Sequence, residues 1–325
     1  MRVIPSLTIA LMLSACTSTG ANAKMANEQS SQSAMSPVQV LPAEEVRMGY
    51  KKHAALAQYY RWYQLYENDE SVIANALDIL DSDITVKSSL GEAKGHDAYA
   101  KRVSGLPKAW DNSHRVQNVN VTPNADGTTD LVANINYHNK GMMPDGTIRS
   151  ANLTYRTKLK QGEALLPKFT AIEIAQNSDG KVDSFVSSYS ENRVRSLLHY
   201  WLALIETPKR DVEPFREIFA DGFRLNFSTG VIDDFDKFKA WYAGPASAVA
   251  ASSHAVTSFT VSDLGQNMFG VKVETDWNGI LPNGTEMLGR TRLNWVVIDN
   301  PVDRFAKIKT VNVEMLVPFQ PKPKN

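Results

Sequence analysis

The chain has 325 residues, 43% of them apolar, and it carries 35 basic and 35 acidic side chains. This balance excludes a large basic surface and, with it, a nucleic-acid partner. The single cysteine excludes a disulfide bond within the chain.

The first residues are typical of a secretory signal. Met1-Arg2 is a short cationic start, and the mostly apolar stretch from Val3 to Leu13 is too short to cross a bilayer as a mature helix. It ends in Leu13-Ser14-Ala15-Cys16, which resembles a bacterial lipobox. The sequence therefore predicts a signal peptide over residues 1–15 and a lipid-modified, palmitate-bearing N-terminus at Cys16.

The residues after Cys16 predict a tether. Residues 16–45 are rich in Ser, Ala, Gln and Asn and show no hydrophobic period, which favours a flexible linker. Thr17 stands where an aspartate would resemble an inner-membrane retention signal. We therefore expect a lipoprotein of the outer membrane that faces the periplasm, with the lipid as its only contact with the membrane.

The remainder of the chain repeats itself at a shift of about 139 residues. The landmarks that recur in the same order are Trp62 and Trp201, Ile84 with Val86 and Phe223 with Leu225, Ser113-His114 and Ser253-His254, Tyr137 and Trp277, Phe169 and Phe305. Solenoid repeats are about 20–50 residues long, so this period indicates a duplicated domain. The predicted domains span residues 46–180 and 190–320.

Each domain is predicted to begin with helices and end with strands. In the first domain, aromatic residues from Tyr59 to Tyr66 recur at helical spacing, a second helix follows, and a third short helix carries Tyr99. In the second domain, four strands are expected at 255–261, 268–278, 287–298 and 305–316. Asn283-Gly284 is typical of a tight hairpin turn between two of them. Helices followed by a long antiparallel sheet predict an α+β fold.

This order of elements resembles a known group of proteins. With a Ser-His pair at a strand start, Gly284-Thr285 at a hairpin turn and Gly289-Arg290 followed by Trp295, it is similar to the nuclear transport factor 2-like superfamily, and within it to SnoaL-like domains. The resemblance implies a cone in each domain, made by a curved antiparallel sheet around about three helices, with an apolar pocket at the open end. Single-domain members usually pair through the outer faces of their sheets. The resemblance therefore implies an intrachain pseudo-dimer that can leave the chain monomeric.

The candidate catalytic residues are His114 and His254. In related enzymes a histidine near this strand start often faces the pocket, and an imidazole with a pKa near 6.5 can move protons. The alternative is that both histidines only satisfy backbone groups or serine hydroxyls. Enzymes of this group usually place an Asp or Glu, or an Asp-His pair, inside the cone, but no clearly repeated carboxylate accompanies the histidine here. Asp97 and Asp236 match in position, but they suit helix caps.

Aromatic residues are the candidates for ligand contact. They are Tyr63, Tyr66, Tyr137, Trp201, Trp241 and Trp277. Packing in the core is the alternative role for such a stripe. The first domain is richer in tyrosine and the second in tryptophan, so the two pockets need not bind the same molecule, and one can be filled by its own side chains.

Two classes of function remain open. One is a lipoprotein that binds a small hydrophobic or aromatic ligand without turnover. The other is a cofactor-free lyase or isomerase in which a pocket histidine transfers protons. The six histidines are scattered without metal-ligand spacing, so neither a metal nor a cofactor is predicted.

Overall fold

The computed structural model describes residues 36–244 and 247–323. The chain divides into two units, residues 1–37 and 38–325, and the helices and strands of the described residues lie in the second. The predicted signal peptide, Cys16 and the linker up to residue 35 lie outside the described residues. The first half here means residues 38–182, and the second half means residues 188–323, which begin with the N-cap residue of α5.

The first half contains four helices and six strands in the order expected. They are α1 (Ala43–Arg61), α2 (Gln64–Glu67), α3 (Ile73–Asp78), β1 (Leu80–Ser88), β2 (Gly91–Lys94), α4 (Gly95–Ser104), β3 (Asp111–Pro123), β4 (Thr128–Lys140), β5 (Ile148–Lys160) and β6 (Lys168–Val182).

The second half repeats this order, with one 3-10 helix in place of two short α-helices. Its elements are α5 (Tyr189–Glu206), η1 (Glu213–Glu217), β7 (Phe219–Phe227), β8 (Gly230–Ile232), α6 (Phe235–Ala243), β9 (Ala251–Gly265), β10 (Met268–Ile280), β11 (Glu286–Ile298) and β12 (Lys307–Pro321).

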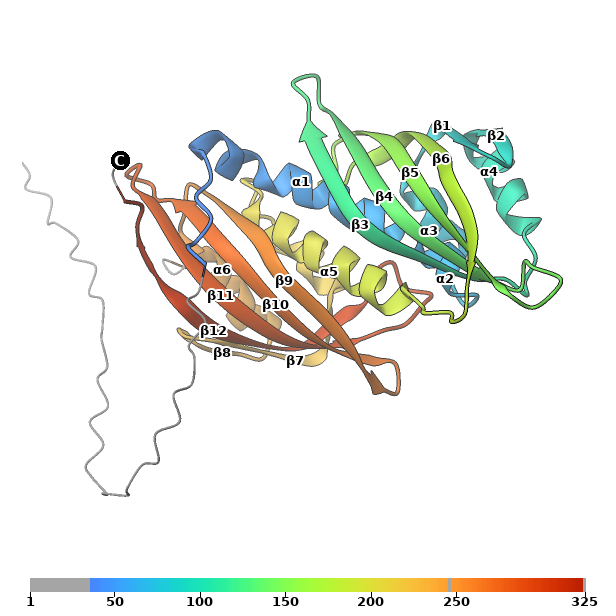
Figure 1. Ribbon diagram of the computed structural model, residues 1–325. Helices are drawn as coiled ribbons and strands as arrows, with labels where there is room; N and C mark the ends of the chain where they lie inside the picture. Colours follow the sequence, from blue (N-terminus) through green and yellow to red (C-terminus); the bar gives the residue numbers. More distant parts are fainter. Residues whose placement is uncertain (1–35, 245–246, 324–325) are drawn as a thin grey trace, which may run out of the picture. The chain divides into compact units, whose positions relative to one another are not determined.

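Each half has one six-stranded sheet (Figure 1). The strand orders are β2-β1-β6-β5-β4-β3 and β8-β7-β12-β11-β10-β9. The prediction of an α+β fold with two sheet domains is confirmed, but the sheets are mixed rather than purely antiparallel, because β1 runs parallel to β6 and β7 parallel to β12. After β1, the chain passes through β2 and α4 to the far edge of the sheet. From there it returns as a four-stranded meander whose last strand lies beside β1.

Strand register confirms the duplication at the level of single residues. His114 pairs with Tyr137, and His254 pairs with Trp277 in the equivalent strands. The predicted match of Phe169 with Phe305 is wrong. Phe169 pairs with Leu80 in the first half, and Phe219, which is the counterpart of Leu80, pairs with Ile308 in the second. Ile308 is therefore the counterpart of Phe169. Phe305 precedes β12, where its ring stacks on that of Tyr200 at 4.4 Å between centroids.

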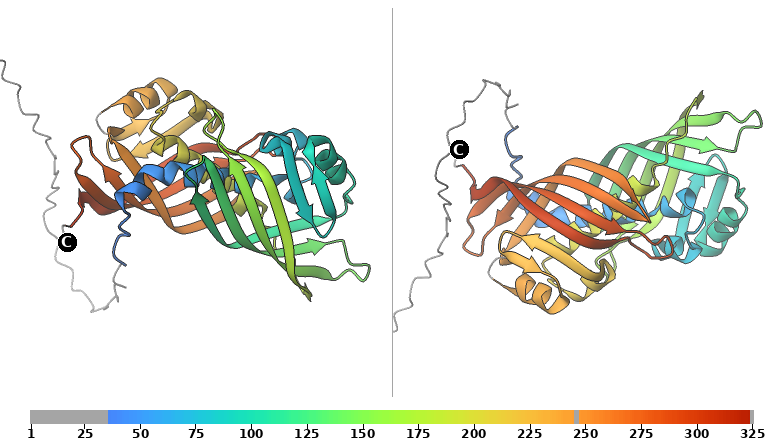
Figure 2. Two further views of the ribbon diagram at one scale, coloured as in Figure 1. Left: turned by 90° about the horizontal axis from the view of Figure 1, so that it is seen from above. Right: turned by 90° about the horizontal axis from the view of Figure 1, so that it is seen from below.

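The two halves pack through their first helices. α1 contacts α5, and both helices also contact the edge strand β9 (Figures 1 and 2). The expected pairing through the outer faces of the sheets is wrong. The residues explain why: α5 is buried almost all round, as in Leu197 and Leu202, while α1 places Ala54 and Ala57 in the same core. Small side chains let two helices approach closely, and a helix that is buried on nearly every side has packing partners on nearly every side.

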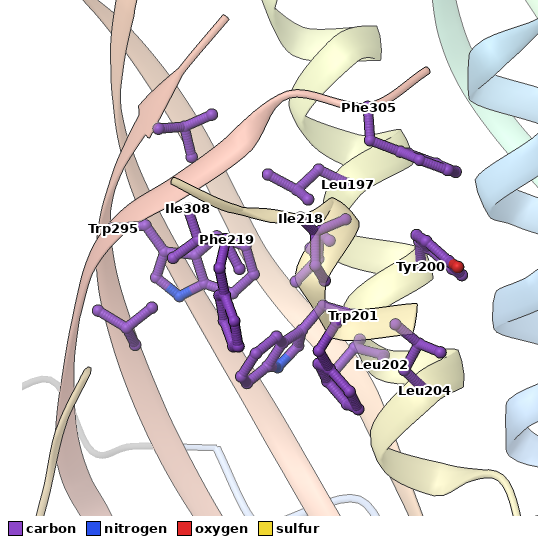
Figure 3. Packing of buried hydrophobic residues seen from close by; sticks show 14 of the residues in the cluster. Leu197, Tyr200, Trp201, Leu202, Leu204, Ile218, Phe219, Trp295, Phe305 and Ile308 are labelled. Atoms are coloured by element: carbon purple, nitrogen blue, oxygen red, sulfur yellow. The ribbon is translucent and has the colours of Figure 1, made fainter. Parts of the chain in front are cut away.

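Large rings fill the core of the second half. Trp201 of α5 packs edge-on against Phe219 of β7 and Trp295 of β11, at 5.9 and 6.0 Å between centroids (Figure 3). All three side chains are buried. In the second half, side chains of α5 and of the sheet therefore pack directly against one another in the core.

The segment before α1 belongs to the folded unit. The backbone amide of Gln39 donates to Asp276 Oδ2 at 2.7 Å, and that of Leu41 donates to Asn278 Oδ1 at 3.0 Å. The side chain of Asn278 donates back to the carbonyl of Gln39 at 3.0 Å. The predicted linker over residues 16–45 is therefore too long at its C-terminal end. The second half holds residues 38–41 against β10.

Candidate functional site

A pocket of about 160 Å³ opens in the first half. Its walls come from the end of α1, from α2 and α4, and from β1, β3, β4, β5 and β6. The lining residues are Trp62, Tyr66, Val86, Ser88, Ser89, Leu90, Arg102, Val103, Leu106, Trp110, Asn112, His114, Tyr137, Met142, Arg149, Leu153, Tyr155, Ile174 and Gln176. The walls are largely apolar and aromatic, which is typical of sites for small organic molecules.

A carboxylate holds the histidine of this pocket. Nδ1 of His114 lies 3.1 Å from Glu67 Oε1, and the backbone amide of His114 donates to the same oxygen at 2.7 Å. Glu67 is the last residue of α2, and its side chain is fully buried. We call Glu67 and His114 the first dyad. With Nδ1–H donating to the carboxylate, Nε2 is the ring nitrogen that carries the lone pair. Among residues 36–244 and 247–323, Nε2 has no hydrogen-bond partner.

The second half completes the first dyad. Ser188 Oγ donates to Glu67 Oε1 at 2.7 Å, and the amide of Asn192 donates to both carboxylate oxygens at 3.1 and 3.0 Å. Asn192 also donates to the carbonyl of His114 at 3.0 Å. Both residues lie at the start of α5, against which α1 packs. The carboxylate is thus fully satisfied by donors from the two halves together.

The same arrangement recurs in the second half with other side chains. Glu206 Oε1 lies 2.9 Å from Nδ1 of His254 and accepts the backbone amide of His254 at 2.7 Å. We call Glu206 and His254 the second dyad. His53 of α1 takes the place of Asn192, with its Nε2 3.0 Å from the carbonyl of His254 and 3.5 Å from Glu206 Oε1. Each dyad is therefore completed by the first helix of the other half.

The second dyad is less well satisfied than the first. Gly49 occupies the position that corresponds to Ser188, so no hydroxyl reaches the carboxylate from α1. Within the described part of the chain, Glu206 Oε2 is buried without a partner. Burial accordingly raises the pKa of Glu206 to about 7 and lowers that of His254 to about 4.

A buried pair of histidines lies next to the second dyad. Nδ1 of His53 lies 2.9 Å from Nδ1 of His199, and the two rings stack at 5.1 Å between centroids. Burial lowers the pKa of His53, against the opposing effect of Glu206. Burial, followed by the neighbouring His53, lowers the pKa of His199 well below its usual value. Both rings are therefore neutral in the folded protein near neutral pH.

Tyrosine hydroxyls distinguish the first core from the second. Tyr63 donates to Tyr59 at 2.5 Å, Tyr66 and Tyr99 share a hydrogen bond of 2.9 Å, and Tyr137 donates to Asn112 at 2.7 Å. Strand register and the shift of about 139 residues identify the second-half counterparts of six core tyrosines. Tyr59, Tyr63, Tyr66, Tyr99, Tyr137 and Tyr155 correspond, in this order, to Leu198, Leu202, Ile205, Phe238, Trp277 and Leu293. None of these counterparts carries a hydroxyl. At these six positions, tyrosine hydroxyls are therefore present only in the first half.

The structure brings some predicted site residues together and keeps others apart. Tyr66 and Tyr137 line the pocket with His114, and Tyr63 stacks on His114 at 4.7 Å between centroids. Trp201 is buried in the core of the second half.

The other two predicted tryptophans also pack on rings of the second half. Trp241 stacks on Phe227 at 4.7 Å between centroids with an interplanar angle of 8°. Trp277 packs on Phe319 at 4.7 Å. Phe227 and Trp241 occupy the positions that Ser88 and Arg102 hold at the pocket of the first half.

The two dyad carboxylates were not among the residues predicted from the sequence. Glu67 and Glu206 match at the common shift and end the aromatic helical region in each half, so the expectation that no acid repeats with the histidine is wrong. Asp97 lies in the first turn of α4 and Asp236 in that of α6, where the capping side chain is that of Asp234. Matching the end of α2 with the end of α5 would have found the glutamates.

Other kinds of site were also sought in the described residues. Residues 36–244 and 247–323 contain no cluster of three or more His, Cys, Asp or Glu side chains that could hold a metal ion. In the same ranges, no helix is long and apolar enough to cross a membrane.

The comparisons with known proteins concern the fold. No model of a known protein family matches the chain, and no curated protein does. The chain is similar to the solved structure of hexachlorocyclohexane dehydrochlorinase LinA-type3 from Novosphingobium barchaimii, at 14% identity over 41% of this chain and 90% of that one, with a TM-score of 0.36.

Two further solved structures also cover less than half of this chain. A nuclear transport factor 2-like superfamily protein from Salmonella enterica serovar Typhimurium matches 39% of this chain and 92% of its own, at 13% identity and a TM-score of 0.35. The Kfla4162 protein from Kribbella flavida matches 40% and 93%, at 11% identity and a TM-score of 0.35.

Proposed function

We propose that the first half is a proton-transfer enzyme of the lyase or isomerase type. Its substrate is a small, largely apolar carbonyl compound that enters the pocket of the first half. The observation that carries the proposal is the position of His114: one ring nitrogen is held by a buried carboxylate, and the other is unpartnered within the described residues at the wall of an aromatic pocket. This is the arrangement that a general base requires.

The geometry suggests a role for each group. Nε2 of His114 takes a proton from the carbon next to the carbonyl, and the carboxylate of Glu67 stabilises the imidazolium that forms. Burial raises the pKa of Tyr66 well above its usual value, so this hydroxyl keeps its proton and can donate it in a hydrogen bond to the carbonyl oxygen as negative charge develops there. An isomerase returns the proton to another carbon, and a lyase expels a leaving group with its electron pair.

Ligand binding without turnover is the second candidate. The specific observation in its favour is the second dyad, which persists in a half where the positions matched to the six core tyrosines of the first half carry no hydroxyl. There, Glu206 accepts the backbone amide of His254 at the start of β9. If the first dyad likewise only holds the start of β3 in place, it takes no part in catalysis. The pocket of the first half is then a binding site for a small hydrophobic molecule.

Deuterium exchange separates the two candidates. The purified chain is incubated in D₂O with a panel of small cyclic and aromatic ketones, and exchange at the carbon next to the carbonyl is followed by NMR. We expect exchange with wild type and with His254→Gln, and a loss of at least about 100-fold with His114→Gln, the range that a general base supplies. Equal exchange by wild type and His114→Gln would refute the proposed reaction.

We also propose that the protein is anchored by a lipid at Cys16 in the outer membrane and faces the periplasm. The lipobox-like Leu13-Ser14-Ala15-Cys16 and the following Thr17 support this proposal. The anchor would be its only contact with the membrane, and its partner would be a small molecule bound by a monomeric chain. Mass spectrometry of the protein purified from membranes tests it. The expected N-terminus is a diacylglyceryl-modified Cys16, and Cys16→Ala should release the protein, whereas an unmodified N-terminus would contradict the proposal.

A further inference from the structure

The pocket of the first half contains positive charge without an acidic counterpart. Two arginines, Arg102 and Arg149, are among its lining residues, and those residues include no aspartate, glutamate or lysine. The carboxylate of the first dyad is buried behind the histidine and is already bonded to four donor groups. The space in which a substrate would lie is therefore bordered by guanidinium groups.

The two arginines differ in their partners. Arg149 donates to Asp179 Oδ1 at 2.9 Å and to Gln176 Oε1 at 2.7 Å, which fixes and largely neutralises it. Arg102 donates only to the carbonyl of Val86 at 3.3 Å, and within residues 36–244 and 247–323 it forms no ion pair. It lies in the last turn of α4 and is half-buried. A half-buried guanidinium with unused donors is suited to bind an anion.

The second half shows that the fold does not require an arginine here. At the common shift, Arg102 corresponds to Trp241 and Ser88 corresponds to Phe227, and these two rings stack on each other at 4.7 Å. The fold thus accepts a neutral ring at the position of Arg102. In the first half the same positions leave the pocket open and place a cation at its wall.

We infer that the substrate of the first half carries an anionic group, such as a carboxylate, which Arg102 binds while the apolar part lies against the aromatic wall. This inference rests on the proposed function for the place of the substrate. Trp110 and Tyr137 supply aromatic surface in the same pocket, and the ring of His114 lies beside that of Tyr137 at 5.1 Å between centroids. The expected class is therefore a small aromatic or cyclic carboxylate rather than a neutral hydrocarbon or a cation.

A matched pair of probes tests the inference. Binding of trans-cinnamate and trans-cinnamamide to the full chain is measured by isothermal titration calorimetry at low ionic strength. The two molecules have nearly the same shape and differ in charge. We expect cinnamate to bind wild type at least about tenfold more tightly, because a hydrogen bond to a charged group adds that much.

Variants assign the preference to one side chain. Arg102→Gln should bring cinnamate to the affinity of cinnamamide and leave cinnamamide unchanged. Arg292→Gln, which removes an arginine from the outer face of the second sheet, should keep the preference of wild type. Thermal melts of each variant verify folding.

Three outcomes overturn the inference. Equal affinities of the two probes for wild type would exclude an anion site, and a preference retained in Arg102→Gln would exclude this arginine. In both cases the proposed proton transfer could still stand on deuterium exchange with neutral ketones. Binding of neither probe, together with no exchange, would remove the inference and the proposed function together.

Discussion

The buried histidines between the two halves should make stability fall in acid. His53 and His199 meet at their Nδ1 atoms, so one of these nitrogens donates and the other accepts. Nε2 of His53 donates to the carbonyl of His254, which leaves its Nδ1 as the acceptor. An additional proton would lie on Nε2 of His199, which has no hydrogen-bond partner among the described residues. Burial lowers both pKa values, so the folded protein stays neutral there while the unfolded chain takes up protons.

The size of the effect follows from proton linkage. Each histidine that is protonated only when unfolded removes about 1.4 kcal/mol of stability per pH unit below a pKa of about 6.5. Two of them remove about 2.7 kcal/mol per pH unit until the pH reaches their lowered folded values. The second dyad changes the pH dependence of stability little between pH 4.5 and 6.5, because it binds one proton in both states. In the folded protein this proton lies on Glu206, whose pKa is raised to about 7, and the pKa of His254 is lowered to about 4. In the unfolded chain the proton lies on His254.

The other half of the chain supplies the substitution that tests this. Asn192 occupies the position matched to His53 and donates both to a dyad carboxylate and to a backbone carbonyl. His53→Asn should therefore fold and should lose about half of the acid-dependent slope that the pair of His53 and His199 contributes. Denaturant unfolding is followed by tryptophan fluorescence from pH 7.5 to 5.0. His96→Asn, which lies in α4 away from this cluster, serves as the control. Parallel stability curves for wild type and His53→Asn would refute the reasoning.

Three further predictions concern contacts between or within the halves. Arg193→Met should lower the free energy of unfolding, measured with denaturant, by about 3–5 kcal/mol. The substitution leaves Asp299 buried without the guanidinium that lies 2.8 Å from its carboxylate. Gly49→Ala should lower the free energy of unfolding by about 1–3 kcal/mol, because its Cβ would clash with Ser253 Oγ. Adding Ser253→Gly should recover part of that loss. Unchanged stability of the single variant would contradict the packing of α1 at Ser253. Asn192→Ala should slow deuterium exchange about 10-fold to 100-fold while cinnamamide still binds, because it removes donors that hold the carboxylate of the first dyad.

Much of the fold could be predicted from the sequence. The aromatic stripe around Trp62, its counterpart around Trp201 and the two Ser-His strand starts were sufficient to place two domains and most strands, because apolar spacing records which face of an element is buried. Parallel pairing of β1 with β6 leaves no local pattern in the sequence. It depends on the path of the chain after β2 and α4, so the expected sheet was antiparallel.

The candidate site was predicted only in part. His114, Tyr66 and Tyr137 do share one pocket, but the first dyad needs Ser188 and Asn192, which come from the other half. Such contacts follow from packing of α1 on α5, and side-chain spacing within one domain cannot reveal them. Comparing the matched positions of the two copies in the structure shows that residues of one half complete the dyad of the other.

The most direct test copies the side chains of the second half onto the first. Ser88→Phe with Arg102→Trp reproduces the stacked pair formed by Phe227 and Trp241. Titration calorimetry with the neutral probe trans-cinnamamide should find one site per wild-type chain and no binding to this double variant at unchanged folding. Two equal sites per wild-type chain, or a double variant that binds as wild type does, would contradict a single working pocket in the first half.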